Sequence, residues 1–454
     1  MKTNVHFSLL GSALILLLPP LLNATNDVWP TWRGTSGAGI APGATPPITW
    51  SDNQNIKWKA KIPGSGFSTP IIWQNRIFVL TAIETNESSP AAASAPPAPS
   101  PEQFKGRRGK KGGGFGSGPN PTKVYEFLVL ALDRQSGKTI WRKTARREVP
   151  HEGHHPSHGF ASASPVTDGQ RLYVSFGSRG LYCYDLDGNL QWERDLGDMR
   201  SRGGFGEGTS PALAGDLLIV TWDHEDQSFI VALDKKTGAE VWRKDRDERS
   251  SWSTPLIVDV DGRLQAIVAA TNRTRSYDAA TGELVWEAGG LTGNVIPMPV
   301  VGHGMVYVMS GFQGNAIQAI KLSSRGDVSD TDNIVWSTRR SAPYVPSPVL
   351  SGNRLYMSKT NDAYLSCLNA LTGEVIYQDQ VLPGVRGIYA SPLAANGHLY
   401  VVGREGTTLV LKDSPRFEVV ATNKLNDRLD ASPVMLGREL YLRGHEFLYC
   451  IAED

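Results

Sequence analysis

Apolar residues along the chain come in short runs that are separated by turn-forming residues. Runs such as RLYVSFG (171–177), DLLIVTW (216–222) and HLYVVG (398–403) are rich in aromatic and β-branched residues and lie close to Gly, Asn or Asp. This pattern is typical of β-strands joined by tight turns. After residue 22 we find no segment with the spacing of a long amphipathic helix. The pattern therefore predicts an all-β protein.

The same group of strands repeats along the sequence about every 45 residues, a period expected of four-stranded repeats. A proline that usually follows Ser or Thr marks each repeat, at Pro70, Pro165, Pro211, Pro255, Pro299, Pro348, Pro392 and Pro433. Apolar runs follow each proline, and several repeats end in a tight turn and a fourth run with an aromatic residue, as in Ala131–Trp141 and Ala232–Trp242. Four short antiparallel strands per repeat predict one blade of a β-propeller.

The two ends of the repeat pattern complete each other. The last repeat, ELYLRGHEFLYCIAED, stops without an aromatic fourth strand, whereas NIKWKAKIPG (55–64) is a fourth strand with no blade of its own. Pairing between these segments would close a ring and hide its edge strands. We therefore expect residues 55–454 to form an eight-bladed β-propeller of four-stranded antiparallel blades, closed by the N-terminal strand.

The repeats resemble the tryptophan-docking repeats of pyrroloquinoline quinone (PQQ) type propellers. The pattern Ala-x-Asp-x-x-Thr-Gly-x-x-x-Trp is matched by Ala232–Trp242 and, with Ser136 in place of Thr, by Ala131–Trp141. Ser276–Trp286 and Cys367–Tyr377 match with a small-residue or aromatic exchange. This family includes quinoprotein alcohol dehydrogenases and the non-catalytic assembly lipoprotein of the outer-membrane β-barrel machinery. The resemblance implies a propeller fold over nearly the whole chain after residue 25.

Three segments lie outside the regular repeats. Residues 1–25 have Lys2 before an apolar run that ends at Pro19 and Pro20, which predicts a secretory signal peptide rather than a membrane span. We therefore expect an exported protein, periplasmic or secreted. Residues 26–54 are expected to dock on the disc as an N-terminal extension. Residues 86–122 are rich in Ala and Pro and then in Gly, Lys and Arg, which predicts a disordered insert in blade 1.

The three cysteines occupy one position of the repeat. Cys183, Cys367 and Cys450 stand where other repeats carry small residues such as Ala131 and Ala232. We therefore expect buried free thiols, one in each of three blades. The formal net charge of +1 argues against a general nucleic-acid binder. We expect a monomer.

Long connections on one face of the disc carry most of the polar side chains. These are the linkers between blades and the turns between second and third strands, where a rigid scaffold places functional groups. The candidate ligand-binding residues are His151, His154, His155, His158, Arg179, Arg202, Asp223, His224, Trp252, Arg273, Arg386, Arg404, Arg428, Asp430 and His445. The many arginines predict a mouth for an anionic or hydroxylated small ligand, or for a protein partner.

Four of the nine histidines lie within eight residues, at His151, His154, His155 and His158. Their spacing would place them on one helix face, but Pro156 and the neighbouring glycines exclude that helix, so they lie on a loop. One hypothesis is a zinc or copper site, completed by Glu152, Asp223 or His224. The alternative, which we prefer, is a ligand-facing or structural loop without bound metal.

The preferred function is a non-catalytic scaffold that binds a ligand or a protein. The alternative is a PQQ-dependent oxidoreductase acting on alcohols or sugars. For that activity the resemblance implies PQQ on a tryptophan floor beneath a disulfide of adjacent cysteines, with Ca²⁺ and an Asp as general base. The sequence has no adjacent cysteines and no haem-binding Cys-x-x-Cys-His. Trp222 and Trp252 are the candidates for this floor, although packing between blades is the simpler role for both. We assign no catalytic residue.

Overall fold

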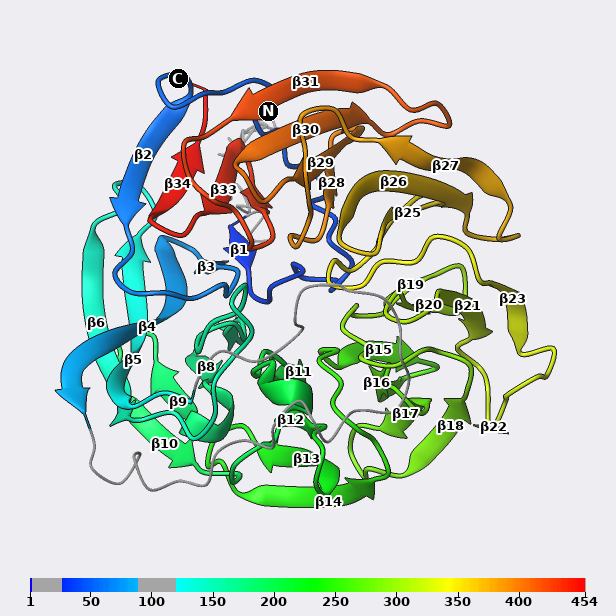
Figure 1. Cartoon of the computed structure of the whole chain (residues 1–454), viewed down its shortest axis with the longest axis horizontal. Helices are drawn as coiled ribbons and strands as arrows, with labels where there is room; N and C mark the ends of the chain where they lie inside the picture. The colour runs from blue at the N-terminus through cyan, green and yellow to red at the C-terminus, as the bar shows by residue number, and fades with distance from the viewer. Residues whose placement is uncertain (2–26, 89–119, 454) are drawn as a thin grey trace, which may run out of the picture.

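The structure is a computed structural model that describes residues 1, 27–88 and 120–453. The expected signal peptide and most of the expected insert lie outside the described residues. Eight β-sheets, each built on four antiparallel strands, surround a central axis as the blades of a closed disc (Figure 1). The eight prolines of the repeat each precede the first strand of a blade. The predicted all-β, eight-bladed propeller is confirmed.

The first four blades follow one another along the chain. Blade 1 contains β3 (Ile71–Trp73), β4 (Arg76–Ser88), β5 (Lys123–Asp133) and β6 (Thr139–Glu148), and β1 (Val28–Trp29) pairs with its inner strand. Blade 2 contains β7 (Val166–Thr167), β8 (Arg171–Ser175), β9 (Leu181–Asp185) and β10 (Leu190–Arg194). Blade 3 contains β11 (Ala212–Ala214), β12 (Leu217–Trp222), β13 (Ser228–Asp234) and β14 (Glu240–Arg246). Blade 4 contains β15 (Leu256–Val260), β16 (Arg263–Val268), β17 (Thr274–Asp278) and β18 (Leu284–Ala288), with β22 (Gly326–Asp327) added in parallel.

The remaining four blades complete the disc. Blade 5 contains β19 (Val300–Gly302), β20 (Met305–Ser310), β21 (Ala316–Lys321) and β23 (Ile334–Thr338). Blade 6 contains β24 (Val349–Ser351), β25 (Arg354–Lys359), β26 (Asp362–Asn369) and β27 (Val375–Val381). Blade 7 contains β28 (Leu393–Ala395), β29 (His398–Val402), β30 (Thr407–Lys412) and β31 (Val419–Lys424). Blade 8 contains β32 (Val434–Leu436), β33 (Glu439–Arg443), β34 (Phe447–Ile451) and, from the other end of the chain, β2 (Ile56–Lys61).

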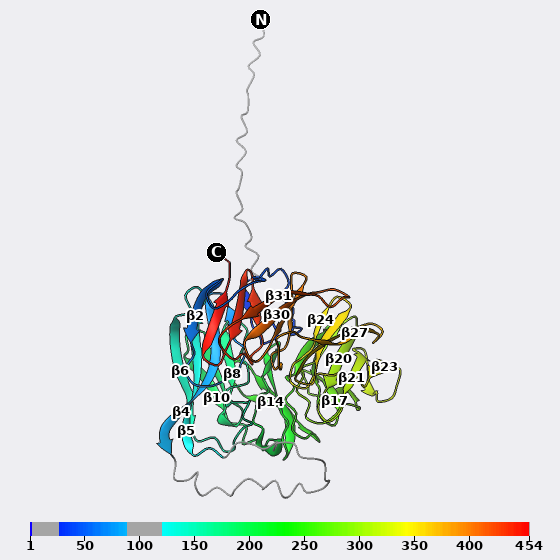
Figure 2. The ribbon, with the colours of Figure 1, turned by 45° about the horizontal axis from the view of Figure 1, so that its top comes forward.

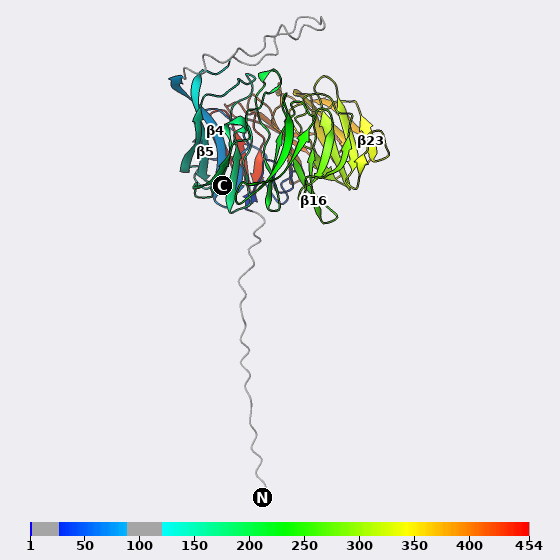
Figure 3. The same ribbon diagram turned by 90° about the horizontal axis from the view of Figure 1, so that it is seen from below.

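The ring closes where the two ends of the chain share a sheet. β2 pairs antiparallel with β34, from Ile56 opposite Ile451 to Lys61 opposite Phe447. β2 and β34 lie side by side in two views of the disc (Figure 1, Figure 2). Seen from the edge, the strands cross the thickness of the disc from one face to the other (Figure 3). Blade 8 therefore has no free fourth position.

Tryptophans of the outer strands bond five of the blades to the following blade. The Trp58 indole nitrogen donates to the Arg134 carbonyl in the last turn of blade 1, at 2.9 Å. A Cβ on Gly137 in that turn would lie 2.5 Å from the Trp58 ring, so the turn needs glycine. Equivalent indole bonds start from Trp141, Trp192, Trp242 and Trp336 and end on the following blade. These aromatic residues of the outer strands therefore lie between neighbouring blades.

The residue before each repeat proline, which is Ser or Thr in seven of the eight blades, belongs to a belt of hydrogen bonds around the axis. The backbone N–H of this residue donates to the hydroxyl of the equivalent residue in the next blade, over 2.9–3.3 Å. Six such bonds run from Thr69 to Ser164, Ser164 to Ser210, Ser210 to Thr254, Met298 to Ser347, Ser347 to Ser391 and Ser391 to Ser432. Blade 5 carries Met298 here, which has no oxygen to accept from blade 4. The belt explains why the repeat carries Ser or Thr at this position.

The described part of the N-terminal extension crosses the face that carries the turns between first and second strands. Thr45 donates its backbone N–H to Gly437 in such a turn, and Ile40 bridges to Ala394. The buried Arg33 guanidinium donates to the carbonyls of Pro392 and Pro348, at the inner starts of blades 7 and 6. This segment therefore reaches the axis of the disc.

The cysteines are buried as predicted, whereas the expected insert begins later than predicted. Cys183, Cys367 and Cys450 are buried free thiols, as expected. β4 runs through Ser88, so the first three residues of the expected insert 86–122 continue this strand. Within the described part of the chain, no helix is long and apolar enough to cross a membrane.

The belt gives a first prediction, at a serine that is 1% exposed. Ser347→Ala removes the acceptor for the Met298 N–H and leaves a buried donor unpaired. We expect the free energy of unfolding to fall by about 1–3 kcal/mol in chemical denaturation. Ser347→Thr, which keeps the hydroxyl, is the matched control and should stay close to the parent protein. Equal stability of the alanine and threonine variants would contradict the proposed role of the belt.

Candidate functional site

A pocket of about 290 Å³ lies on the axis of the disc. Belt hydroxyl residues line it, among them Ser164, Ser210 and Ser391, which places the pocket at the centre of the ring. Aromatic side chains form much of its remaining wall. They are Trp32, Phe67, Phe205, Trp252, Phe312, Tyr344 and Tyr389. The volume is near the lower end of the roughly 300–1,000 Å³ of ligand pockets.

Trp32 of the N-terminal extension closes the pocket on the face with the short turns. It is the only described residue before β2 that lines the pocket, and the adjacent Arg33 is bonded to the inner ends of blades 6 and 7. The opposite side is lined by linker residues such as His155, Phe205 and Tyr389. The pocket is therefore closed on the face with the short turns, and a ligand would enter it from the face that carries the linkers between blades.

His158 presents a neutral imidazole to this pocket. Its Nδ1 lies 2.7 Å from the Gly159 nitrogen, 3.0 Å from the Gly159 carbonyl oxygen and 2.9 Å from the Ser162 hydroxyl, so it can accept or donate according to the tautomer. Burial lowers the pKa of His158 to about 4, and the nearby His154 adds to this shift. His155 lines the same pocket, and burial also lowers its pKa. Both rings can therefore act as uncharged hydrogen-bonding groups at pH 7.

Asp430 is the one carboxylate among the described residues that line the axial pocket. Arg404 binds it with two hydrogen bonds of 2.6 and 3.1 Å, and His445 Nε2 lies 3.0 Å away. Burial raises the pKa of Asp430, but the bonds from His445 and Arg404 outweigh burial and hold it below its usual value. The Arg404 guanidinium also lies 3.6 Å from the centre of the Tyr389 ring. This network fixes Tyr389 at the wall of the pocket.

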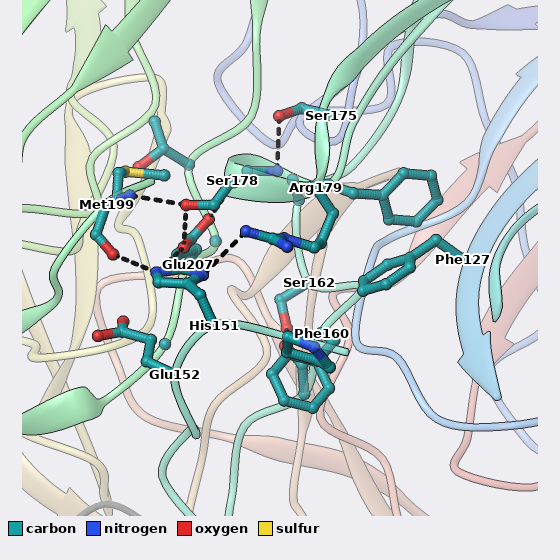
Figure 4. Close-up of a pocket in the computed structure, with 18 of the residues that line it drawn as sticks. Phe127, His151, Glu152, Phe160, Ser162, Ser175, Ser178, Arg179, Met199 and Glu207 are labelled. Atoms are coloured by element: carbon teal, nitrogen blue, oxygen red, sulfur yellow. Dashed lines mark hydrogen bonds and ion pairs between the residues drawn. The ribbon is translucent and has the colours of Figure 1, made fainter. Parts of the chain in front are cut away.

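A second, smaller cavity of about 40 Å³ lies among the connections of blades 1, 2 and 3. His151 and Glu152 come from the linker before blade 2, and Glu207 comes from the linker before blade 3. One ligand atom from each of these three side chains lies within 4.8 Å of the others. Figure 4 shows His151 and Glu207 close together, with Arg179 pointing toward them. Burial raises the pKa of Glu207 to about 7.

The four predicted histidines separate into different environments. His151 lies in the small cavity, whereas His155 and His158 line the axial pocket. His154 packs edge-on against Phe160, with ring centres 4.6 Å apart. Among the described residues, the group with metal-ligand geometry takes only His151 from this set. The loop is therefore shared between two sites.

Most of the other candidate residues do not line the axial pocket. Asp223 is buried against Arg246 through bonds of 2.7 and 3.0 Å, and His224 accepts from the Arg200 N–H. Both residues hold blade 3 together. Of the site residues predicted from sequence, only His155, His158, Trp252 and Asp430 line the axial pocket.

The arginines of the candidate set are held by other protein groups. Arg179 pairs with Glu148 and Asp198, and Arg273 pairs with Asp327 and Glu287. Arg202 donates to Asn294 at 3.2 Å. Arg386 and Arg428 lie with Arg404 around a separate shallow basin. No described residue lining the axial pocket is an arginine, so the expected arginine-rich mouth does not describe this pocket.

Most of the residues that line the axial pocket were not predicted from sequence. Phe67, Phe205 and Tyr344 stand next to Gly, Ser or Pro in linkers, and Tyr389 lies two residues from Gly387, which is a weak signal without the ring geometry. Glu207 was visible in the linker GEGTSP but had no neighbouring histidine in sequence. The belt position itself was visible as the Ser or Thr before each proline.

Comparison with known proteins indicates the family. A family model described as outer membrane protein assembly factor BamB matches residues 126–253 and 226–347. Together with the fold, this match supports a PQQ-like β-propeller family for the chain. No curated protein matches the sequence closely enough to count as a relative.

Solved structures of this family share the fold. BamB from Moraxella catarrhalis is 14% identical with a TM-score of 0.54, over 72% of this chain and 93% of that one. Quinohemoprotein alcohol dehydrogenase from Comamonas testosteroni is 10% identical with a TM-score of 0.63, over 95% of this chain and 81% of that one. Quinohemoprotein alcohol dehydrogenase ADHIIG from Pseudomonas putida HK5 is 10% identical with a TM-score of 0.56, over 94% and 80%. At these identities the likeness concerns the fold alone.

The residues around the axial pocket do not fit PQQ with Ca²⁺. The cysteines lie buried in three different blades, so they form no disulfide cap. The lining carboxylate, Asp430, already binds Arg404 and His445, and Ca²⁺ requires six to eight oxygen ligands. Trp252 donates its indole N–H to the Gly206 carbonyl at 2.7 Å in the pocket wall, whereas Trp222 packs on Phe229 within blade 3. A quinone bearing carboxylates would also meet a wall without arginine.

The buried imidazole predicts a specific dependence of stability on pH. The unfolded chain takes up the His158 proton near the ordinary pKa of 6.5, whereas the folded protein does so only near 4. His158 therefore contributes no penalty above pH 6.5, and it destabilises the protein progressively as the pH falls to 4, by up to about 3 kcal/mol. His158→Asn keeps an acceptor at the Nδ1 position but does not titrate.

The measurement is chemical denaturation of the parent protein and of His158→Asn between about pH 7.5 and about pH 4, a range that includes the pKa of His158 in the unfolded and in the folded protein. We expect the parent protein to lose more stability than His158→Asn over this range. His303→Asn, on an exposed turn, is the control and should follow the parent protein. Parallel curves for the parent protein and His158→Asn would show that His158 is not held neutral.

Proposed function

We propose that this chain is a non-catalytic binding protein that holds a neutral, hydroxylated small molecule, such as a sugar, in the axial pocket. The observation that carries this proposal is the combination of aromatic rings and hydroxyl groups around a pocket closed by Trp32. Aromatic faces stack on flat apolar surfaces, and a few oriented polar groups then set specificity. Sugar rings offer both kinds of surface.

Hydrogen-bonding groups of both kinds surround the proposed ligand. The neutral His158 imidazole has one donor and one acceptor nitrogen, and the hydroxyls of Ser162 and Tyr389 lie in the same wall. Tyr344 stacks on Phe312, with ring centres 4.9 Å apart and planes 25° apart, which presents a broad aromatic surface. The Tyr389 ring, held by Arg404, offers a second surface. These groups suit a hydroxylated ring better than an extended peptide.

The charge around the pocket favours a neutral ligand over an anion. Asp430 is the lining carboxylate, and Arg404 neutralises it from outside the lining. An anionic ligand would therefore find no free guanidinium in the described wall and would approach a carboxylate. We choose the hydroxylated ligand from the two classes that the sequence predicted.

The oxidoreductase alternative has weaker support in this pocket. Its cofactor would need a donor set that the described residues do not supply. The fold is shared by BamB, which is described as an assembly factor, and by quinohemoprotein alcohol dehydrogenases, which are enzymes. The fold therefore does not distinguish the two functions, and our choice rests on the residues of the pocket.

We also propose that the protein works outside the cytoplasm as a monomer. Support comes from the signal-like sequence of residues 1–25 and from three cysteines that stay buried and unpaired, which avoids disulfide formation after export.

The proposed function predicts saturable binding of a neutral carbohydrate. Titration of a panel of neutral mono- and disaccharides, followed by calorimetry and by tryptophan fluorescence, should identify at least one ligand. Tyr389→Ala should weaken its binding about 10-fold or more, since loss of one stacking surface costs roughly 1–2 kcal/mol. Tyr364→Ala, on the exposed part of β26, is the matched control and should bind normally.

The same samples test the alternative. Titration with PQQ plus Ca²⁺ and a dye-linked alcohol or sugar oxidation assay should show neither tight binding nor turnover. Tight PQQ binding with turnover would replace the proposal by the oxidoreductase. Failure of every carbohydrate to bind would contradict the proposed ligand class.

A further inference from the structure

We propose that the small cavity between the connections of blades 1, 2 and 3 is a divalent metal site formed by His151, Glu152 and Glu207. This site takes one histidine of the histidine-rich loop and two carboxylates, one of which comes from the following linker. It lies beside the axial pocket, and Ser162 and Gly208 line both cavities. It is independent of the proposed carbohydrate ligand.

Serines hold both carboxylates in place in the same way. Glu207 accepts from the Ser178 N–H and hydroxyl, each at 2.6 Å. Glu152 accepts from the Ser201 N–H at 3.1 Å and from its hydroxyl at 2.5 Å. A carboxylate has about four lone-pair positions, so each group retains capacity for a cation. The two carboxylates are therefore oriented before any ion binds.

His151 is placed with its Nε2 toward the carboxylates. Nε2 lies 3.8 Å from Glu207 Oε1 and 2.6 Å from the Met199 carbonyl oxygen. Two ligand atoms on a tetrahedral zinc ion, each about 2.1 Å from the metal, lie roughly 3.4 Å apart. Only a small contraction is needed to bring Nε2 and Oε1 onto one ion. The Met199 carbonyl oxygen, which now accepts from Nε2, would have to move away from it by roughly 0.8 Å to serve as a further ligand of a tetrahedral ion.

Asp198 is placed to orient the other side of the ring. Its Oδ1 lies 3.6 Å from His151 Nδ1, the carboxylate–histidine arrangement that often supports metal-binding imidazoles. Arg179 also reaches Nδ1, at 3.2 Å, but Glu148 and Asp198 balance its charge. In the ion-free protein Nε2–H donates to Met199. On metal binding the ring changes tautomer: Nε2 releases its proton and Nδ1 takes one up from solvent, so the ring stays neutral. Nδ1–H then faces Asp198, and the Arg179 group that donated to Nδ1 keeps its pairing with Glu148 and Asp198.

A separate observation indicates that a ligand belongs in this cavity. Thr221 lines it and is 4% exposed, yet its hydroxyl has no hydrogen-bond partner among the described residues. An unpaired buried hydroxyl is costly, and a metal-bound water would pair with it. The cavity encloses about 40 Å³, whereas roughly 10–15 Å³ already holds one water. An ion with a bound water therefore fits.

The donor set selects the kind of metal. One imidazole with carboxylate and carbonyl oxygens suits Zn²⁺ or Mn²⁺ better than Cu(I), which prefers sulfur. Such an ion would tie the linker before blade 2 to the linker before blade 3. Its role would be to fix the wall that the two cavities share.

The first test is calorimetric titration of the chelator-treated, dialysed protein with Zn²⁺ and, separately, Mn²⁺, with metal analysis after desalting. We expect one equivalent to bind to the parent protein, and Glu207→Gln and His151→Gln to weaken binding at least 100-fold. Glu225→Gln is the matched control, because Glu225 is held by the Ser250 N–H and hydroxyl in the same way but is outside the metal group. The double change His154→Ala with His155→Ala should also bind normally.

The outcomes separate a built site from adventitious binding. Absence of stoichiometric metal in the parent protein would overturn the proposal, as would binding that survives Glu207→Gln but disappears when His154 and His155 are changed. Because Glu207 also holds its linker through Ser178, visible absorption of the Co²⁺-loaded parent protein gives a second readout that needs no substitution. Bands of a tetrahedral nitrogen–oxygen site are expected, and the spectrum of hydrated Co²⁺ alone would contradict the assignment.

Discussion

The pairing of β2 with β34 is the contact on which the rest of the fold depends. It joins two strands from opposite ends of the chain and gives blade 8 its fourth strand. β2 also carries Trp58, whose indole binds the last turn of blade 1, so one strand completes a blade and bonds it to its neighbour. The wall of the axial pocket crosses this seam, with Thr69 on one side and Ser432 on the other. Without closure the pocket would lack part of its wall.

The arrangement of the two cavities follows from the same ring. The belt of Ser and Thr hydroxyls holds the inner strands at fixed distances, and the linkers that enter those strands are positioned with them. Aromatic residues of different linkers therefore meet around the axis, while the two linkers before blades 2 and 3 bring His151 to Glu207. The histidine-rich loop serves both places because it lies between them.

The repeat made the fold accessible from sequence alone. The eight repeat prolines predicted the number of blades, and the unpaired segment NIKWKAKIPG predicted where the ring closes. These signals are local and periodic, so they do not depend on knowing which blades face each other. The free cysteines followed for the same reason, since one repeat position has one environment.

The site was harder to predict because its residues meet only in three dimensions. His155, His158, Trp252 and Asp430 were among the candidates predicted from sequence and line the axial pocket, but sequence could not show that Asp223 is buried against Arg246. Charged residues in linkers look alike in sequence whether they bind a ligand or one another. Trp32 belongs to the extension that was expected to dock on the disc, and it also lines the pocket. These outcomes depend on contacts between segments distant in the chain.

Native-state hydrogen exchange of the backbone amides in β2 and β34 tests the central claim most directly. If closure holds the ring, the paired amides around Lys59 and Tyr449 should exchange slowly and with the same free energy of opening. That free energy of opening should approach the value for fully buried strands in the middle of a blade, such as β20. Fast exchange of β2 while β34 and the other blades stay protected would show that the strand is a dispensable attachment and would contradict the account.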